Sequence, residues 1–347
     1  MSVSADPAGR EERPPVRSST SDAATATPAA AAGSRLPYHV FRAAQQVVRV
    51  LPRGVSYALG AAGAQLLARA RPQRFEGLRA NLRQVMPDAN PAAVERVLRR
   101  NVGNVARCWV DVMEMPYRQR QVMQRLDIID GLPHFTAASE RGRGVVVVSL
   151  HFGNWETGLA AWNGIGGDLA LLAEQVQPIE LFERIADARR SLGVRVIPLD
   201  AAAMRSGDPA AARRVGANTM REVLKQLRSG NVIAIAMDRD ITGTGVELPF
   251  FGRPAPIPLG TVDVAIRAGA AIVPITLKRS RQRVHCWVHP EVKYDAQAPR
   301  DAEVRRVAEE VLRLFEITIR EHPDMWHVLE PIWSDQTDVA STKVDIQ

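Results

Sequence analysis

The chain has 347 residues, 46% of them hydrophobic and 24% charged, which is enough apolar sequence for one large globular domain or two small ones. Lys and Arg outnumber Asp and Glu by 45 to 38, and this excess favours an anionic membrane surface or an acidic ligand. Basic and aromatic residues are not interleaved as in proteins that bind single strands, so we expect no nucleic-acid partner. Cys108 and Cys286 lack the spacing of a metal site or a disulfide framework, which favours a reducing, cytosol-facing location.

Both ends of the chain are predicted to be disordered tails. Residues 1–34 are rich in Ala, Ser, Thr, Pro and Gly and show no apolar periodicity. They also lack the apolar run of a secretory signal. Residues 336–347 are predicted to form the second tail.

Residues 35–127 are predicted to form an N-terminal helical region that associates with a membrane. Between Leu36 and Ala70 the sequence is helical and strongly apolar, and a break at residues 51–54 predicts a helical hairpin. Neither half contains the ~20 consecutive apolar residues that a membrane-spanning helix needs. Arginines flank both halves, so the hairpin suits a position in the membrane surface. A hairpin packed on the core explains the pattern equally well.

Residues 128–335 are predicted to form the core domain. Short apolar strands alternate with helices, an order typical of an α/β fold with a central, mostly parallel sheet flanked by helices. The expected parallel strands are residues 145–150, 169–173, 193–198, 232–237 and 271–277, followed by an antiparallel strand at 284–292. Residues 201–217 are rich in small and charged residues and are expected to form a loop, inserted before a helix that starts at Thr219.

The stretch from Gly144 to Glu156 carries the clearest chemical signal. Four valines predict a strand buried on both faces, turn residues follow, and a helix can begin at Trp155. This order places His151 at the carboxyl end of a central strand, where open α/β sheets bind their ligands. A neutral histidine can act there as a general base near pH 7, and a carboxylate on its other ring nitrogen would fix its tautomer.

Glu156 is the nearest candidate for that carboxylate. On one continuous helix, residues five apart point about 140° away from each other, so Glu156 can reach His151 only if the turn folds it back. The alternative is structural, with His151 capping the helix and Glu156 as a solvated acid in its first turn. The spacing alone leaves both interpretations open.

A second group of charged residues follows the fourth predicted strand. Asp238, Arg239 and Asp240 reach the same sheet edge as His151 if the two strands run parallel, and Glu174 ends another strand at that edge. An Asp-x-Asp sequence also suits a divalent cation that holds a nucleotide-sugar diphosphate, which makes a metal-dependent glycosyltransferase an alternative. No glycine-rich phosphate loop follows any strand, and that alternative leaves His151 without a role.

Two further patterns argue against other chemistries. Ser149 lacks the Gly-x-Ser-x-Gly elbow of α/β hydrolases. His285, Cys286 and His289 lie on one strand pattern without a further ligand, which argues against zinc. We therefore expect neither a serine nucleophile nor a metal.

The two charged stretches resemble those of a known enzyme family. Residues 151–156, His-Phe-Gly-Asn-Trp-Glu, resemble the His-x4-Glu/Asp block of the lysophospholipid acyltransferase superfamily, in its lipid A lauroyl/myristoyl acyltransferase branch. Residues 238–252, Asp-Arg-Asp-Ile-Thr-Gly-Thr-Gly-Val-Glu-Leu-Pro-Phe-Phe-Gly, are most similar to the phosphatidylinositol mannoside acyltransferases within that branch. The resemblance extends over roughly residues 38–335, almost everything outside the tails.

This resemblance implies a membrane-associated O-acyltransferase. Such an enzyme moves a fatty acyl chain from acyl-CoA or acyl carrier protein to a sugar hydroxyl of a glycolipid of the phosphatidylinositol mannoside or lipid A type. It uses the acyl thioester as co-substrate and needs no cofactor and no metal. It lies at the cytoplasmic face of the cell membrane, peripheral or anchored by the N-terminal helices. A non-catalytic lipid-binding protein remains as another alternative to the acyltransferase.

The resemblance also implies roles for particular residues. His151 is the expected general base, with Glu156 orienting it and Asp238 supporting it. Arg239, Asp240, Glu174 and Asn154 are the expected substrate-binding residues. Backbone amides of the Gly153–Asn154 turn, or Arg239, are candidate donors to the oxyanion that forms on the thioester carbonyl.

Overall fold

The computed structural model describes residues 34–162, 168–280 and 283–333, all of which fall in one compact unit. Of the predicted disordered tails, residues 1–33 and 336–347 lie outside the described residues.

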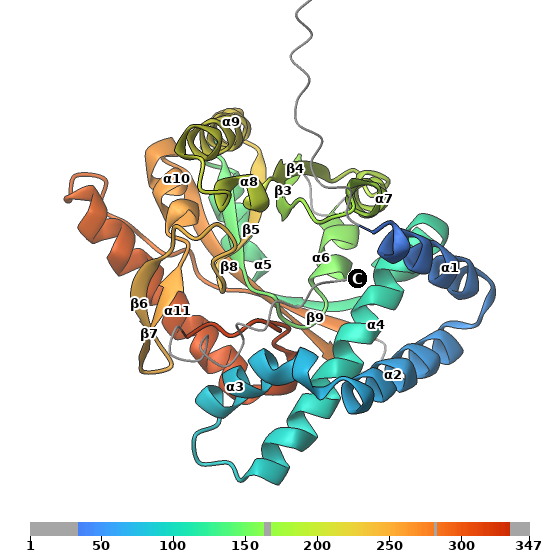
Figure 1. Ribbon diagram of the computed structural model, residues 1–347. Helices are drawn as coiled ribbons and strands as arrows, with labels where there is room; N and C mark the ends of the chain where they lie inside the picture. The colour runs from blue at the N-terminus through green and yellow to red at the C-terminus, as the bar shows by residue number, and fades with distance from the viewer. Residues whose placement is uncertain (1–33, 163–167, 281–282, 334–347) are drawn as a thin grey trace, which may run out of the picture. The chain divides into compact units, whose positions relative to one another are not determined.

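The N-terminal part of the chain is helical and is organised around one long helix. Its helices are α1 (Leu36–Val50), α2 (Arg53–Ala70), η1 (Pro72–Phe75), α3 (Glu76–Val85) and α4 (Pro91–Met123). The predicted break between the first two helices is confirmed, and both lie against α4 (Figure 1). Asn90 caps α4 by accepting a hydrogen bond from the Ala93 N–H at 2.9 Å, and Pro91 occupies the first helical position.

Helices α1 and α2 bury one side and expose apolar side chains on another. Phe41, Val48 and Tyr57 are buried against α4 and its neighbours. The large apolar residues that the two helices expose are Leu36, Val40, Val47, Val50, Val55, Leu59, Leu66 and Leu67. In the described part of the chain, no helix combines the length and the apolar character needed to cross a bilayer. The N-terminal helices therefore pack on the rest of the protein and still present an apolar surface.

A seven-stranded sheet lies at the centre of the described residues. Its order is β1-β9-β8-β2-β5-β3-β4. The strands are β1 (Leu126–Asp130), β2 (Val145–Ser149), β3 (Leu169–Glu174), β4 (Arg195–Leu199), β5 (Val232–Ala236), β8 (Ala271–Ser280) and β9 (Arg283–Val288). Strands β8, β2, β5, β3 and β4 run parallel, whereas β9 and β1 run the opposite way. The predicted α/β fold with a mostly parallel sheet is confirmed.

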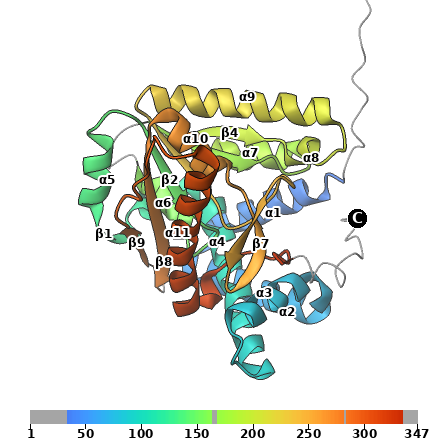
Figure 2. The same ribbon diagram turned by 90° about the vertical axis from the view of Figure 1, so that its left-hand side faces the viewer.

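Helices cover both faces of this sheet (Figures 1 and 2). One face packs against α9 (Pro209–Arg228), α10 (Gly260–Ala268) and α11 (Arg300–Glu321) through an apolar cluster that includes Val146 and Val148. The other face packs against α5 (Leu132–Ser139), α6 (Trp155–Ala161) and α7 (Ile179–Arg190) through a cluster that includes Val145 and Val147. Strand β2 is therefore buried on both faces, as its four valines predict.

The predicted loop at residues 201–217 is wrong. This stretch forms α8 (Ala201–Met204) and the first half of α9. The side chains of Asp200 and Asp208 accept hydrogen bonds from the N–H groups of the first helical turns. Most of the small residues here are alanines, which favour helix more than any other residue. The stretch therefore forms two capped helices in spite of a composition typical of a loop.

Two further elements were not predicted from the sequence. The first is β1 at the edge of the sheet, and the second is a separate hairpin of β6 (Val246–Phe250) and β7 (Arg253–Ile257) beside α11 (Figure 1). Pro249 and Pro254 face each other in the hairpin, and Pro256 follows. Prolines normally argue against strands, but a two-stranded ribbon has outer edges where no N–H is needed.

Candidate active site

His151 lies at the carboxyl end of β2, directly beside the end of β5. The two strands pair in parallel, with Ser149 opposite Ala236. Two residues further along each strand come His151 and Asp238, so the register brings these side chains together. The prediction that they share a sheet edge is confirmed.

Asp238 binds both the ring and the main chain of His151. Nδ1 of His151 lies 2.8 Å from Oδ1 of Asp238, and the His151 main-chain N–H donates to Oδ2 at 2.9 Å. The indole N–H of Trp326 also donates to Oδ2, at 2.9 Å. With the Nδ1 proton donated to the carboxylate, Nε2 is left as the basic nitrogen of a side chain that lines a cavity.

Asp238 is fully buried, yet its environment favours the carboxylate. Burial raises its pKa, but the charge of His151 and the hydrogen bonds from His151 and Trp326 outweigh burial, so the net pKa is lowered. Burial also lowers the pKa of the neighbouring His327 to about 4. Near neutral pH, the site therefore contains an ionised Asp238 and a neutral His327.

The turn after His151 requires a glycine. Gly153 has a φ of 61°, and a Cβ there would come within 1.6 Å of the Leu277 carbonyl oxygen. The Gly153 N–H donates to the Met325 carbonyl at 2.8 Å, and the Gly153 carbonyl accepts from Nε2 of His327 at 3.0 Å. The Gly153 amide is therefore already engaged, contrary to the expectation that it donates to an oxyanion.

The Glu156 carboxylate does not bind His151, the expected partner. It is buried in the first turn of α6, and both its carboxylate oxygens accept from Arg189 of α7, at 2.6 and 3.3 Å. The Arg189 guanidinium also lies 5.0 Å from the centre of the Trp155 ring. The orienting contact on Nδ1 of His151 therefore comes from Asp238, because α6 directs Glu156 towards α7.

Asn154 occupies a supporting position rather than a substrate-facing one. It is fully buried, its Oδ1 accepts from the Thr157 N–H at 3.4 Å, and its Nδ2 donates to Asp111 of α4 at 2.5 Å. Asp111 is itself paired with the buried Arg125 and Arg279. Asn154 therefore begins α6 and ties the turn after His151 to α4.

Arg239 lies between two carboxylates at the sheet edge. Its guanidinium is 2.8 Å from Glu174 and 2.7 Å from Glu330. These three residues line a polar hollow of about 250 Å³, and Arg239 and Glu174 also line the larger cavity beside His151. Asp240 lines the hollow too, but its carboxylate accepts from the N–H groups of residues 242, 243 and 245 and so holds the loop after β5.

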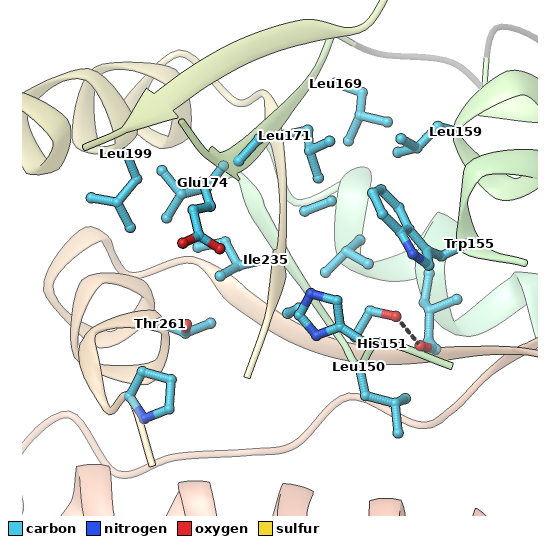
Figure 3. Close-up of a pocket in the computed structure, with 18 of the residues that line it drawn as sticks. Leu150, His151, Trp155, Leu159, Leu169, Leu171, Glu174, Leu199, Ile235 and Thr261 are labelled. Atoms are coloured by element: carbon cyan, nitrogen blue, oxygen red, sulfur yellow. Dashed lines mark hydrogen bonds between the residues drawn. The ribbon is translucent and has the colours of Figure 1, made fainter. Parts of the chain in front are cut away.

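A cavity of about 550 Å³ adjoins His151 (Figure 3). Between the sheet and helices α5 and α6, its lining is mainly apolar: Leu132, Phe135, Leu159, Trp162, Leu169, Cys286 and Val288. Arg189 of α7, which is paired with Glu156, also lines the cavity. Burial raises the pKa of the Cys286 thiol to about 12, so this thiol is uncharged near neutral pH. The part under helices α8 to α10 is mixed, with Met204, Thr219, Met220, Thr261 and Val264. Figure 3 shows His151 between Leu159 and Leu169 on one side and Leu199 and Thr261 on the other.

The described residues also bear on two other kinds of site. Among those residues, no group of three or more His, Cys, Asp or Glu side chains is arranged to hold a metal ion. The Ser149 hydroxyl donates to the Ile275 carbonyl at 2.9 Å, so it is held away from a nucleophile's role.

Comparison with known proteins decides the family. Residues 37–335 match the model of the bacterial lipid A biosynthesis acyltransferases, which is most of the chain. The chain belongs to this family. The resemblance stated from the sequence is thus confirmed, and this lipid A biosynthesis acyltransferase homologue is an enzyme that transfers acyl groups.

Two curated relatives of this acyltransferase carry a more specific name. It is 31% identical over 300 residues to the phosphatidylinositol mannoside acyltransferase of Mycobacterium tuberculosis (strain CDC 1551 / Oshkosh), covering 84% of this chain and 87% of the relative. It is 28% identical over 304 residues to that of Mycolicibacterium smegmatis (strain ATCC 700084 / mc(2)155), covering 84% and 90%.

The structure adds site residues that the sequence analysis of this acyltransferase missed. Trp326 and His327 reach the turn after His151 from the C-terminal end of the described chain, and Arg189 pairs with Glu156. The position of Arg189 gives a weak signal in the sequence, because this arginine falls on the apolar face of the amphipathic helix α7. Trp326 has no local signal, because its contact to Asp238 spans 88 residues of sequence.

Proposed function

We propose that this acyltransferase moves a fatty acyl chain from a thioester to a sugar hydroxyl of a glycolipid, with His151 as general base and Asp238 orienting it. The observation that carries the proposal is the His151–Asp238 pair beside a large, mainly apolar cavity. Nε2 of His151 takes the proton of the acceptor hydroxyl, whose oxygen attacks the thioester carbonyl carbon. The tetrahedral intermediate then expels the thiolate, which receives that proton from His151.

The acyl chain is proposed to lie between the sheet and helices α5 and α6. This part of the cavity offers mainly hydrocarbon side chains and one protonated thiol, and Arg189 is already paired with Glu156, so a fatty chain buries its surface without leaving a polar group unpaired. The total volume, about 550 Å³, is within the range of pockets that enclose whole ligands. The threonines under α9 and α10 suit the polar remainder of the thioester.

The acceptor sugar is proposed to bind in the polar hollow beside this cavity. Glu174 and Glu330 offer acceptors for hydroxyl groups, and Arg239 offers donors. Because Arg239 and Glu174 line both spaces, a hydroxyl bound there has access to His151. The names of the curated relatives favour a mannosylated phosphatidylinositol, and the family name favours lipid A.

Neither a cofactor nor a metal is needed for this reaction. The thioester is already activated, and a positioned base is sufficient to raise the nucleophilicity of the hydroxyl. Acyl-CoA and acyl carrier protein carry the same thioester, so either can serve as donor.

The protein is proposed to lie on the cytoplasmic face of the membrane through α1 and α2. These helices expose apolar residues such as Val50 and Leu66, and Arg42, Arg49 and Arg69 lie along them. A surface of this composition suits the interface of an anionic bilayer, where glycolipid acceptors are found. Co-sedimentation with anionic but not neutral vesicles is the expected result, and loss of binding in a Val50→Glu, Leu66→Glu variant would assign it to this surface.

The proposed activity can be tested by identifying the product. Purified protein is incubated with palmitoyl-CoA and a membrane glycolipid extract, with and without EDTA, and the lipids are analysed by mass spectrometry. We expect an EDTA-resistant glycolipid product heavier by one palmitoyl group. Release of free palmitate with no acylated glycolipid, or acylation of a non-sugar lipid, would contradict the proposed acceptor.

A further inference from the structure

The segment that follows α11 pairs with the catalytic turn. It consists of η3 (Pro323–Met325), Trp326 and His327. The Gly153 N–H donates to the Met325 carbonyl at 2.8 Å, and the His327 N–H donates to the His151 carbonyl at 2.7 Å. Between these two bonds, Phe152 and Trp326 form an antiparallel bridge. The segment therefore binds the backbone of the turn that carries the general base.

The same segment is anchored to α4. The Asn101 side chain donates to the Trp326 carbonyl at 2.6 Å and to the Pro323 carbonyl at 3.3 Å. The Asn104 side chain donates to the Asp324 carbonyl at 2.9 Å. The position of the segment is therefore set partly by a helix outside the sheet.

The side chain of Trp326 directs its one polar atom at Asp238. It is fully buried, its ring centre lies 5.9 Å from that of Phe250 and 6.1 Å from that of Phe251, and its N–H donates to Oδ2 of Asp238 at 2.9 Å. Because Oδ2 also accepts the His151 main-chain N–H, the two donors fix the carboxylate plane and leave Oδ1 for the imidazole.

We propose that Trp326 is a positioning residue of the active site, acting on His151 through the carboxylate of Asp238. The proposal rests on the catalytic roles proposed above for His151 and Asp238. The titratable groups that face Asp238 are His151, from the turn after β2, and His327, from the C-terminal segment; Arg279 of β8 acts on His327. Trp326 thus adds a neutral donor that holds the carboxylate in place without competing for a proton.

Loss of the indole N–H has a consequence that loss of packing does not have. The hydrogen bond from Trp326 is one of the contacts that lower the pKa of Asp238, so removing it raises that pKa. The acidic limb of the pH–rate profile reports the coupled His151–Asp238 pair and therefore moves to higher pH. A purely structural tryptophan would change stability and leave this limb in place.

The chain offers a matched control. Trp326→Phe keeps an aromatic ring and removes the N–H. Trp333→Phe does the same at an equally buried tryptophan that packs on the same two phenylalanines but donates to the Phe250 carbonyl, at 3.2 Å. Both variants lose a similar amount of packing, and only the first changes the donors on Asp238.

Two measurements are made on the wild type and both variants. The first is kcat/KM for acyl transfer against pH, and the second is the NMR titration midpoint of the His151 ring, assigned with His151→Ala, which needs no turnover. For Trp326→Phe we expect both the acidic limb and the midpoint to move to higher pH. We expect kcat of Trp326→Phe at pH 7 to fall about tenfold. We expect Trp333→Phe to leave the acidic limb and the His151 titration midpoint unchanged.

An unchanged midpoint in Trp326→Phe, or equal shifts in both variants, would overturn the proposal. A shifted midpoint in a protein that transfers no acyl group would uphold the positioning role and refute the proposed function. If Trp326→Phe does not fold, β-(3-benzothienyl)alanine incorporated at position 326 replaces the N–H by sulfur in a ring of the same shape, and the same shifts are expected.

Discussion

Replacing Asp238 with asparagine keeps the shape of the side chain but turns one carboxylate oxygen into an NH2 group. Oδ2 accepts two hydrogen bonds, from the His151 main chain and from Trp326, both at 2.9 Å. An NH2 group at that position would face two donors, so the amide must place its oxygen there and its NH2 opposite Nδ1 of His151. Nδ1 then has to accept, and the ring proton moves to Nε2, the atom that must take the acceptor's proton.

The magnitude of this effect follows from the tautomer. In the serine proteases, the same aspartate-to-asparagine change preserves the geometry and lowers kcat by about 10⁴-fold, and we expect a loss of about 10³- to 10⁴-fold here. Asp238→Ala leaves two buried donors without their acceptor, which costs about 1–3 kcal/mol of stability for each. Its imidazole is nevertheless free to choose either tautomer. Asp238→Asn should therefore be the more stable of the two variants and no more active.

Thiol release from palmitoyl-CoA in the presence of acceptor gives kcat for the wild type and both variants, and thermal denaturation gives their relative stability. The reasoning would be refuted if Asp238→Asn kept more than about a tenth of the wild-type kcat. It would equally be refuted if Asp238→Asn were much more active than Asp238→Ala, since the wrong tautomer would then carry no penalty.

Three further predictions concern residues around the pair. Glu156→Gln leaves the Arg189 guanidinium buried without its carboxylate and should lower the free energy of unfolding in chemical denaturation by about 3 kcal/mol. Its loss of kcat should be far smaller than that of His151→Ala. A large loss of kcat with little loss of stability would return the orienting role to Glu156. Cys286→Phe narrows the apolar part of the cavity and should shift the preference to shorter acyl-CoAs. The expected change in kcat/KM is about fourfold for each methylene group that no longer fits. An unchanged chain-length profile would exclude this part of the cavity as the acyl site. His327 has its pKa lowered from 6.5 to about 4, so its contribution to stability is complete above pH 6.5 and declines as the pH falls to about 4, by about 3 kcal/mol in total. His327→Gln should flatten the fall in melting temperature across this window, and parallel curves for the two proteins would contradict it.

The sheet edge that carries the active site could be predicted from the sequence for a simple physical reason. Parallel strands end at one edge, so the apolar runs before His151 and Asp238 were sufficient to place both residues there. Arg239 and Glu174 follow by the same rule. Which carboxylate meets His151 could not be predicted, because the direction in which α6 leaves the turn decides where Glu156 points.

Long-range and compositional features account for the remaining differences. Trp326 reaches Asp238 by a contact that no pattern near either residue indicates. Residues 201–217 form capped helices, although their composition of alanine with a few charged residues is equally typical of a loop. The β6–β7 hairpin forms in spite of its prolines because its strands do not need every N–H for pairing.

The most direct test of His151 as the general base compares acyl transfer by three proteins: the wild type, His151→Ala and Ser149→Ala. Ser149 lies two residues earlier on the same strand and loses only its hydrogen bond to the Ile275 carbonyl, so it controls for local disturbance. We predict that His151→Ala still folds cooperatively and lowers kcat by about 10²- to 10⁴-fold, while Ser149→Ala stays within a few fold of the wild type. Wild-type rates in His151→Ala, or loss of transfer in Ser149→Ala alone, would contradict the mechanism.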